Sequence, residues 1–167
     1  MGTIKPKAIY PGSFNPPTLA HQNIWEQARS IFDVTVVVAQ NPDKITTSTD
    51  RIDLIEDMGV LTSRIYIAPI GQSIVDTCEE LKTRYIIRGL RGPSDFEHEA
   101  AYADFIRKSS DGYLQVIYFM TPAGFQHISS SLVRSIMKLN NWMEDRLLDP
   151  YVPKPVIKSL ELNPDLV

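Results

Sequence analysis

The sequence predicts an α/β fold built on a five-stranded parallel sheet with helices on both faces. Short β-branched runs alternate with amphipathic segments along almost all of the 167 residues, which is the pattern of βαβ units. The runs are apolar throughout, as expected of strands covered on both faces. No internal repeat and no linker rich in Gly, Ser or Pro interrupts the chain. A single domain is therefore expected over residues 1–167.

The strands and the first three helices follow from the periodicity of apolar residues. Strands are expected at about residues 7–10, 34–39, 65–68, 85–88 and 114–119. Three sets of apolar residues at helical spacing predict one helix in each of the first three intervals. Each set should form a buried stripe: Ile24, Ala28 and Ile31, then Ile52, Ile55 and Met58, then Ile74, Cys78 and Leu81.

Capping residues and prolines locate the remaining helix boundaries. Ser73, followed three residues later by Asp76, resembles a capping box and marks the start of the third helix. A fourth helix is expected over about 94–108, and a last one from about Pro153, which suits a first helical turn. The fifth should begin near Ser129 and turn three residues inward: Leu132, Ile136 and Leu139. The tail, 161–167, is expected to be loosely held.

Composition excludes several classes of function. Lys and Arg total 17 against 20 Asp and Glu, a net charge of -3, so the chain lacks the basic excess of a nucleic-acid-binding protein. The single cysteine, Cys78, can form neither an internal disulfide nor a multi-thiolate zinc site, and it suits a reducing compartment. No signal peptide is recognisable, and no apolar run approaches the roughly 20 residues of a membrane span. A cytoplasmic protein with no nucleic-acid or membrane partner is expected.

Four loops that follow predicted strands carry residue types that an anionic ligand requires. Ligands of parallel sheets bind beyond the carboxyl ends of the strands, where helix N-termini present free N–H groups. The first loop, 10–21, is rich in Gly and Pro and delivers Thr18 and His21 to a helix start, although turn chemistry alone explains much of it. The second loop ends at Lys44, which taken alone is better explained as one of many solvated surface lysines.

The third and fourth loops add phosphate-binding chemistry. Arg88 and Arg91 bracket a Gly-Leu pair at a strand end, and guanidinium groups offer planar, bidentate donors to phosphate oxygens. The fourth loop, 127–131, carries three consecutive serines before a helix. Ser129 is a good N-cap in its own right, but three serines with a helix dipole behind them also suit a polyphosphate. It is the coincidence of all four loops that points to an anion site.

Two of these loops carry the resemblance to a known family. Residues 11–21, PGSFNPPTLAH, resemble the (T/H)xGH signature of the nucleotidyltransferase superfamily, and 128–134, ISSSLVR, resemble its ISSTxxR partner. The resemblance implies a Rossmann-like nucleotidyltransferase fold. Within the superfamily, 87–99, IRGLRGPSDFEHE, is similar to the segment that marks bacterial phosphopantetheine adenylyltransferases. The similarity extends over about 7–134.

The resemblance implies an activity. That activity is transfer of the adenylyl group of ATP to 4'-phosphopantetheine, giving dephospho-coenzyme A and pyrophosphate in the penultimate step of coenzyme A synthesis, with Mg²⁺ as the cofactor. The acceptor phosphate is already an anion and attacks the α-phosphorus directly, so catalysis consists of positioning and charge neutralisation. The resemblance also implies a homohexamer and feedback inhibition by coenzyme A.

The family's site residues transfer onto matching positions of this chain. Ser13, Lys44 and Arg88 would hold the pantetheine phosphate, and Ile74 would line the pantetheine arm. His21 and Thr18 would bind the α-phosphate, while Lys44 and Arg91 offset charge; no protein side chain is assigned to a metal. The ATP-binding set implied is Ser13, Phe14, His21, Gly89, Leu90, Arg91, Glu99, Phe125, Gln126, His127, Ile128, Ser129, Ser130 and Ser131.

Two departures from the family pattern keep alternatives open. Ala20 stands where the signature has Gly, so its methyl group could crowd the phosphate, and Asn15 stands where Asp is common. A catalytically silent nucleotide-binding protein is therefore one alternative. Nicotinate mononucleotide adenylyltransferase is another, because GSFNPP also resembles its first loop. A cytidylyltransferase is more distant, since its RTxGISTT-like serine loop is absent, and no GxGxxG supports a redox enzyme.

Overall fold

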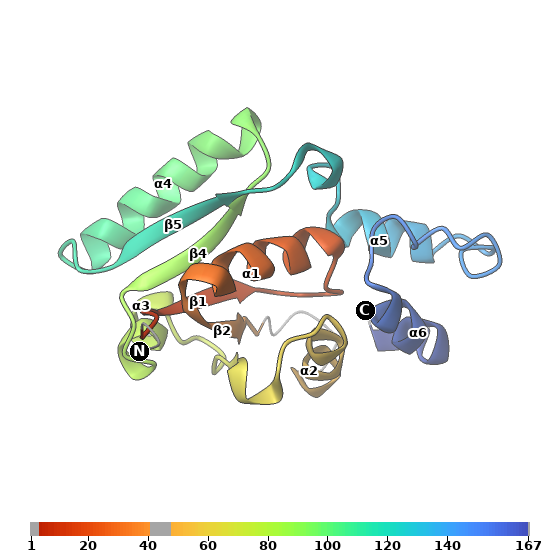
Figure 1. The fold of residues 1–167 in the computed structure, drawn as a ribbon, viewed down its shortest axis with the longest axis horizontal. Coiled ribbons are helices and arrows are strands. Elements are labelled where there is room, and N and C mark those ends of the chain that lie inside the picture. Colours follow the sequence, from red (N-terminus) through yellow and green to blue (C-terminus); the bar gives the residue numbers. More distant parts are fainter. Residues whose placement is uncertain (1–3, 41–47, 167) are drawn as a thin grey trace.

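The computed structural model describes residues 4–40 and 48–166 and contains one parallel sheet, which confirms the predicted fold class. The strands run in the order β3-β2-β1-β4-β5, so the strand order reverses between β1 and β4 (Figure 1). Their bounds are β1 Lys7–Gly12, β2 Asp33–Val38, β3 Ile65–Ile67, β4 Tyr85–Leu90 and β5 Gln115–Met120. Four of the five continue one or two residues past their predicted start or end, and β1 and β4 gain two residues at their carboxyl ends.

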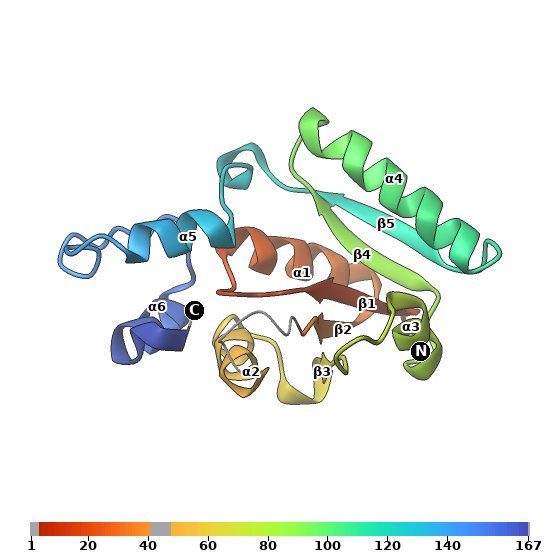
Figure 2. The same ribbon diagram turned by 180° about the vertical axis from the view of Figure 1, so that it is seen from behind.

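Six α-helices and three short 3₁₀ turns connect and flank the described strands. The helices are α1 Leu19–Ile31, α2 Ser48–Asp57, α3 Ile74–Glu80, α4 Pro93–Ser109, α5 Ser130–Met137 and α6 Lys154–Leu162. The turns are η1 Thr62–Arg64, η2 Ala123–Phe125 and η3 Pro164–Leu166. Figures 1 and 2 show α4 alongside β5, and α5 and α6 beyond the carboxyl end of β1. None of the described helices is long and apolar enough to cross a bilayer.

The sheet divides the interior into two apolar clusters. Alternate strand residues point to opposite faces, so Ala8 and Tyr10 enter one cluster and Ile9 enters the other. Helices α1, α2, α5 and α6 supply the first cluster, whereas α3 and α4 cover the second through Cys78 and Ile106. Cys78 is fully buried, as its place in a predicted stripe required, and burial raises the pKa of its thiol to about 12.

Two of the predicted stripe positions, Ile31 and Leu139, are exposed. Ile31 is 54% exposed because α1 ends there, and the chain turns Phe32 into the core instead. Leu139 is 49% exposed because α5 stops at Met137, and Val133 rather than Leu132 takes the fully buried position. The errors at Ile31 and Leu139 come from continuing a helical period to the last residue of a helix or beyond it.

The predicted helix starts agree closely with the structure. The capping box of Ser73 and Asp76 is present at α3, and Ser129 caps α5. Pro153 is the residue before α6 rather than part of its first turn. The tail was expected to be loose, but its described part forms η3, from which Leu166 packs against the first cluster.

Candidate active site

A cavity of about 380 Å³ opens between the carboxyl ends of β1 and β4, where the strand order reverses and where open α/β sheets bind their ligands. Three helices, α1, α4 and α5, begin around it and direct the positive ends of their dipoles toward this region. Its lining consists of Tyr10, Pro11, Gly12, Thr18, Ala20, His21, Ile24, Arg88, Gly89, Arg91, Asp95, His98, Glu99, Thr121, Ile128, Ser129 and Ser130.

The first turn of α1 fixes the orientation of His21. Thr18 is the N-cap, and its backbone N–H donates to His21 Nδ1 at 3.1 Å, while its hydroxyl oxygen lies 2.9 Å from the same nitrogen. A nitrogen that accepts from a backbone N–H carries no proton, so the imidazole proton sits on Nε2. The capping box therefore presents His21 to the cavity as an Nε2–H donor.

The surroundings of His21 keep its ring neutral. Burial and, to a lesser degree, the nearby positive charge of Arg91 lower the pKa of His21 from 6.5 to about 4. The Phe14 ring packs against the imidazole with centroids 5.1 Å apart, and Tyr10 packs on Phe14 in turn. At neutral pH the ring is therefore uncharged. It donates a hydrogen bond through Nε2–H, but it is not the imidazolium form that would act as a general acid.

The start of α5 holds the β1–α1 loop in place. Ser130 Oγ donates to the Pro16 carbonyl at 2.8 Å, and the Arg134 guanidinium donates to the Asn15 carbonyl. On the far side of the loop, the Leu19 N–H donates to the Tyr151 carbonyl at 2.9 Å. The two loops that carry the sequence signatures are thus joined directly by hydrogen bonds.

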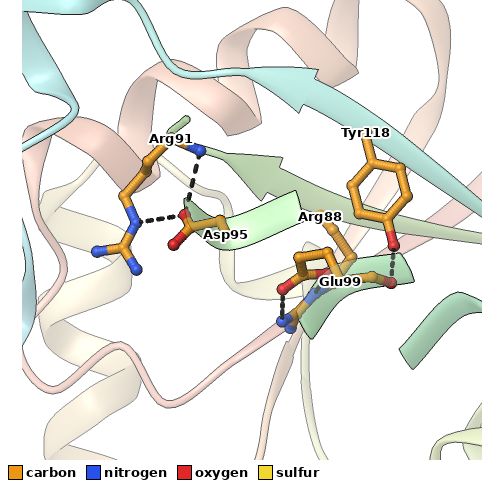
Figure 3. A network of polar contacts seen from close by, with 5 residues as sticks. All are labelled: Arg88, Arg91, Asp95, Glu99 and Tyr118. Atoms are coloured by element: carbon orange, nitrogen blue, oxygen red, sulfur yellow. Dashed lines mark hydrogen bonds and ion pairs between the residues drawn. The ribbon is translucent and has the colours of Figure 1, made fainter. Parts of the chain in front are cut away.

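The opposite wall of the cavity, called here the β4–α4 wall, contains two ion pairs to α4, one from Arg88 on β4 and one from Arg91 just after β4 (Figure 3). Arg88 donates to Glu99 through Nε at 3.0 Å and Nη2 at 2.5 Å, a bidentate contact. Burial works against the charge of Arg88, but the hydrogen bond and charge of Glu99 outweigh it and raise the pKa of Arg88. Arg91 Nε donates to Asp95 at 3.0 Å.

Glycine is required at two places on the cavity wall. A Cβ on Gly89 would lie 3.1 Å from Ile24 Cγ1, and one on Gly12 would lie 2.9 Å from the Phe14 ring. A side chain at either position would therefore displace α1 or the ring that supports His21. Both glycines lie at strand ends that face the cavity.

The comparisons with known proteins agree with this geometry. The Cytidylyltransferase-like family matches residues 9–136. The phosphopantetheine adenylyltransferase of Nautilia profundicola is 37% identical over 92% of this chain and 98% of the relative. The enzyme of Staphylococcus carnosus is 33% identical over 93% of this chain and 94% of the relative. The enzyme of Clostridium botulinum is 31% identical over 87% of this chain and 90% of the relative.

The chain belongs to the phosphopantetheine adenylyltransferase family. Solved structures share the fold at lower identity. Plasmodium falciparum nicotinic acid mononucleotide adenylyltransferase superimposes with a TM-score of 0.66 at 18% identity, covering 95% of both chains. A lipopolysaccharide core biosynthesis protein from Thermoplasma volcanium gives 0.51 at 21% identity, covering 68% of this chain and 95% of that one.

The structure brings together about half of the residues that the adenylyltransferase resemblance selected. Those that line the cavity are Thr18, His21, Arg88, Gly89, Arg91, Glu99, Ile128, Ser129 and Ser130. Predicted residues outside its lining are Ser13, Phe14, Ile74, Leu90, Phe125, Gln126, His127 and Ser131. Lys44 lies outside the described residues.

The predicted residues outside the lining have identifiable surroundings. Phe14 is fully buried behind His21, and Ile74 packs on the second cluster at the start of α3. The Ser13 carbonyl accepts a hydrogen bond from Arg51 at 3.4 Å. Leu90 faces a separate apolar hollow with Phe96 and Met120, and the His127 ring packs edge-on against Tyr151.

Sequence reasoning missed four polar or aromatic residues of the lining: Tyr10, Asp95, His98 and Thr121. A signal existed for Asp95, because residues four apart share a helix face and Glu99 was already assigned. Thr121 follows the last strand, which places it at the same edge of the sheet as the assigned loops.

Within the described residues, no cluster of three His, Cys, Asp or Glu side chains could hold a metal ion. The two carboxylates of the cavity, Asp95 and Glu99, are each engaged by an arginine. Mg²⁺ commonly keeps several waters and binds through substrate phosphates rather than through an all-protein cage. The residues present therefore fit a magnesium ion that arrives with a polyphosphate.

Proposed function

We propose that this chain transfers the adenylyl group of ATP to 4'-phosphopantetheine at the cavity between β1 and β4. The observation that carries the proposal is the fixed Nε2–H donor of His21, held where the two signature loops meet and faced by two arginines. Family membership, at 31–37% identity over most of the chain, supports the choice of acceptor.

The proposed reaction is an in-line displacement. A phosphate oxygen of phosphopantetheine forms a bond to the α-phosphorus of ATP, while the bond from that phosphorus to the oxygen bridging to the β-phosphate breaks. Pyrophosphate leaves with the electron pair, and dephospho-coenzyme A is the other product. No proton needs to be removed from the attacking group, since the acceptor phosphate is already ionised.

His21 stabilises the transition state in this scheme. Charge builds on the non-bridging oxygens of the α-phosphate, and a preorganised donor in a partly water-excluded site stabilises that charge without reorganising. Thr18 contributes by holding the ring, because both its N–H and its hydroxyl engage Nδ1. Its hydroxyl is buried against the ring, so positioning His21 is a better-supported role than a direct phosphate contact.

Cations and helix ends offset the remaining charge. Arg88 on β4 and Arg91 just after it face the phosphates, and the family resemblance adds Lys44 to this set. The N-terminus of α5, capped by Ser129, faces the β- and γ-phosphates through its backbone N–H groups. When bound with ATP, Mg²⁺ supplies charge neutralisation across the polyphosphate.

The proposal extends to the working state of the enzyme: a cytoplasmic homohexamer inhibited by coenzyme A. The family resemblance supports it, together with large exposed apolar side chains on α4 and the turn after it, namely Phe96, Phe105 and Tyr113. Light scattering of the purified chain measures the assembly directly. A monomer at working concentration would contradict the hexamer.

Pyrophosphate release tests the proposed reaction. The purified chain is assayed with ATP and Mg²⁺, using 4'-phosphopantetheine or nicotinate mononucleotide as the acceptor, with omission of Mg²⁺ as the control. Release that requires both Mg²⁺ and phosphopantetheine is expected. Release with nicotinate mononucleotide alone would reassign the substrate, and ATP binding without release would favour a silent nucleotide-binding protein.

A further inference from the structure

The two ion pairs of the β4–α4 wall differ in how firmly they are held. Glu99 receives two hydrogen bonds from Arg88, and its backbone carbonyl accepts one from the Tyr118 hydroxyl at 2.6 Å. The Arg88 guanidinium also lies over the Tyr102 ring at 4.9 Å. With side chains only 33% and 15% exposed, this pair is anchored on several sides.

The second pair depends on a single carboxylate oxygen. Asp95 Oδ2 accepts from Arg91 Nε at 3.0 Å and from the Arg91 backbone N–H at 3.2 Å. The side chains are 47% and 25% exposed, and the side-chain contact that Figure 3 draws from Arg91 to Asp95 comes from Nε alone. Exposed pairs of this kind contribute only about 0.2–1 kcal/mol.

Asp95 would remain satisfied if the Arg91 side chain moved away. Its carboxylate would keep the hydrogen bond from the Arg91 backbone N–H. It also lies in the first turn of α4, where the helix dipole favours a negative charge. Glu99, by contrast, accepts a bidentate pair of hydrogen bonds from the Arg88 guanidinium, so that moving Arg88 away would break both of them.

The charged side chains of the cavity balance one another while both ion pairs are intact. Among the described lining residues, the charges of Arg88 and Arg91 are matched by those of Asp95 and Glu99. A polyphosphate that enters the cavity therefore gains a full cation only if an arginine changes partner. Arg91 is the one that can do so at little energetic cost.

We propose that Asp95 is a positioning residue that holds Arg91 in the empty site and competes with the polyphosphate for it. Arg91 exchanges Asp95 for phosphate oxygens when ATP binds, and Asp95 takes it back as pyrophosphate leaves. This role rests on the proposed function, because it requires a polyphosphate in the cavity. It makes Asp95 a residue that weakens product binding.

The test is a calorimetric titration of the intact protein with inorganic pyrophosphate in the presence of Mg²⁺. Asp95→Asn should bind pyrophosphate about fivefold more tightly than the wild type, the size expected from releasing a partly exposed ion pair. The matched control is Glu97→Gln, on the exposed surface of the same helix and outside the cavity lining. It should change the affinity by less than about 1.5-fold.

A double-mutant cycle separates competition for Arg91 from simple repulsion. In an Arg91→Gln background, Asp95→Asn should leave pyrophosphate affinity unchanged. Equal tightening in both backgrounds would overturn the inference, and so would weaker binding by Asp95→Asn alone. A wild-type chain that bound neither ATP nor pyrophosphate would overturn the proposed function itself, so the two failures are distinguishable.

Discussion

The two walls of the cavity are held by different kinds of interaction. On the α1–α5 side, Ser130 and Arg134 donate to backbone carbonyls, and the Thr18 backbone donates to His21. On the β4–α4 side, side-chain carboxylates hold the two arginines. The first wall is fixed by hydrogen bonds to the main chain. The second wall carries arginines that can also bind an anionic substrate.

This difference assigns a separate task to each wall. Transition-state stabilisation requires donors whose positions do not change, because reorganisation during the reaction reduces their effect. Binding and release of a charged substrate and product instead benefit from partners that can exchange. The α1–α5 wall suits the α-phosphorus, and the β4–α4 wall suits the charged groups that enter and leave.

The largest expected effect comes from removing the fixed donor. His21→Asn keeps an acceptor for the Thr18 N–H at the capping position but removes the Nε2–H that faces the cavity. Turnover should fall by about 100- to 1000-fold, as expected for loss of one preorganised donor. The dissociation constant of ATP should change less than about threefold, measured by calorimetry. Equal losses in turnover and ATP affinity would show that His21 does not act specifically on the transition state.

The low pKa of His21 in the folded chain also predicts a dependence of stability on pH. Its pKa is about 4 in the folded chain against 6.5 ordinarily, so the unfolded state takes up the proton first as the pH falls from 6.5 to 4. Over that window His21 should reduce the free energy of unfolding by up to about 3 kcal/mol, with no contribution above pH 6.5.

Urea unfolding of the wild type and His21→Asn, compared at pH 7 and pH 4.5, measures this contribution. The wild type should lose more stability than the variant between the two pH values. An equal loss in both proteins would mean that the imidazole is charged, or freely chargeable, in the folded chain.

A smaller effect is expected when the two signature loops are uncoupled. Ser130→Ala removes the hydrogen bond to the Pro16 carbonyl, and loss of such a bond costs about 1 kcal/mol of stability. Turnover should fall by about tenfold, because a small displacement of the loop moves His21. Ser135→Ala is the control, since its hydroxyl bonds only within α5, to the Ser131 carbonyl. Equal activity of the two variants would show that the α1–α5 wall does not depend on this bond.

The smallest effect is expected at Ala20. The residue lies in the first turn of α1 and lines the cavity while almost fully buried. Ala20→Gly should lower stability by about 0.5–1 kcal/mol through helix propensity and alter turnover less than about threefold. A rise in turnover of about a hundredfold would show instead that the methyl group crowds the phosphate.

The sequence predicted the fold because the fold depends on local patterns, and the residues selected from the sequence include about half of the cavity lining. The apolar runs of β1 and β4 and the capping residues Ser73 and Ser129 act within a few residues of chain. The site residues came mainly from the family resemblance, since turn chemistry alone left His21 ambiguous.

What the sequence did not predict depends on contacts between distant segments. Arg134 was recognised as a signature residue, but its bond to the Asn15 carbonyl spans 119 positions. Ile31 and Leu139 were misplaced because the end of a helix depends on what packs beyond it. Asp95 was overlooked even though its partner, Arg91, lies only four residues before it, because its role depends on the cavity that the distant strands β1 and β4 form.

Product analysis of the wild type beside His21→Asn tests the central claim most directly. Both proteins receive ATP, Mg²⁺ and 4'-phosphopantetheine, and dephospho-coenzyme A is quantified by mass spectrometry against pyrophosphate. The account predicts equal amounts of the two products from the wild type and about 100-fold less of each from a variant that still binds ATP. Wild-type protein that makes no dephospho-coenzyme A, or a variant that makes it at the wild-type rate, would contradict the account.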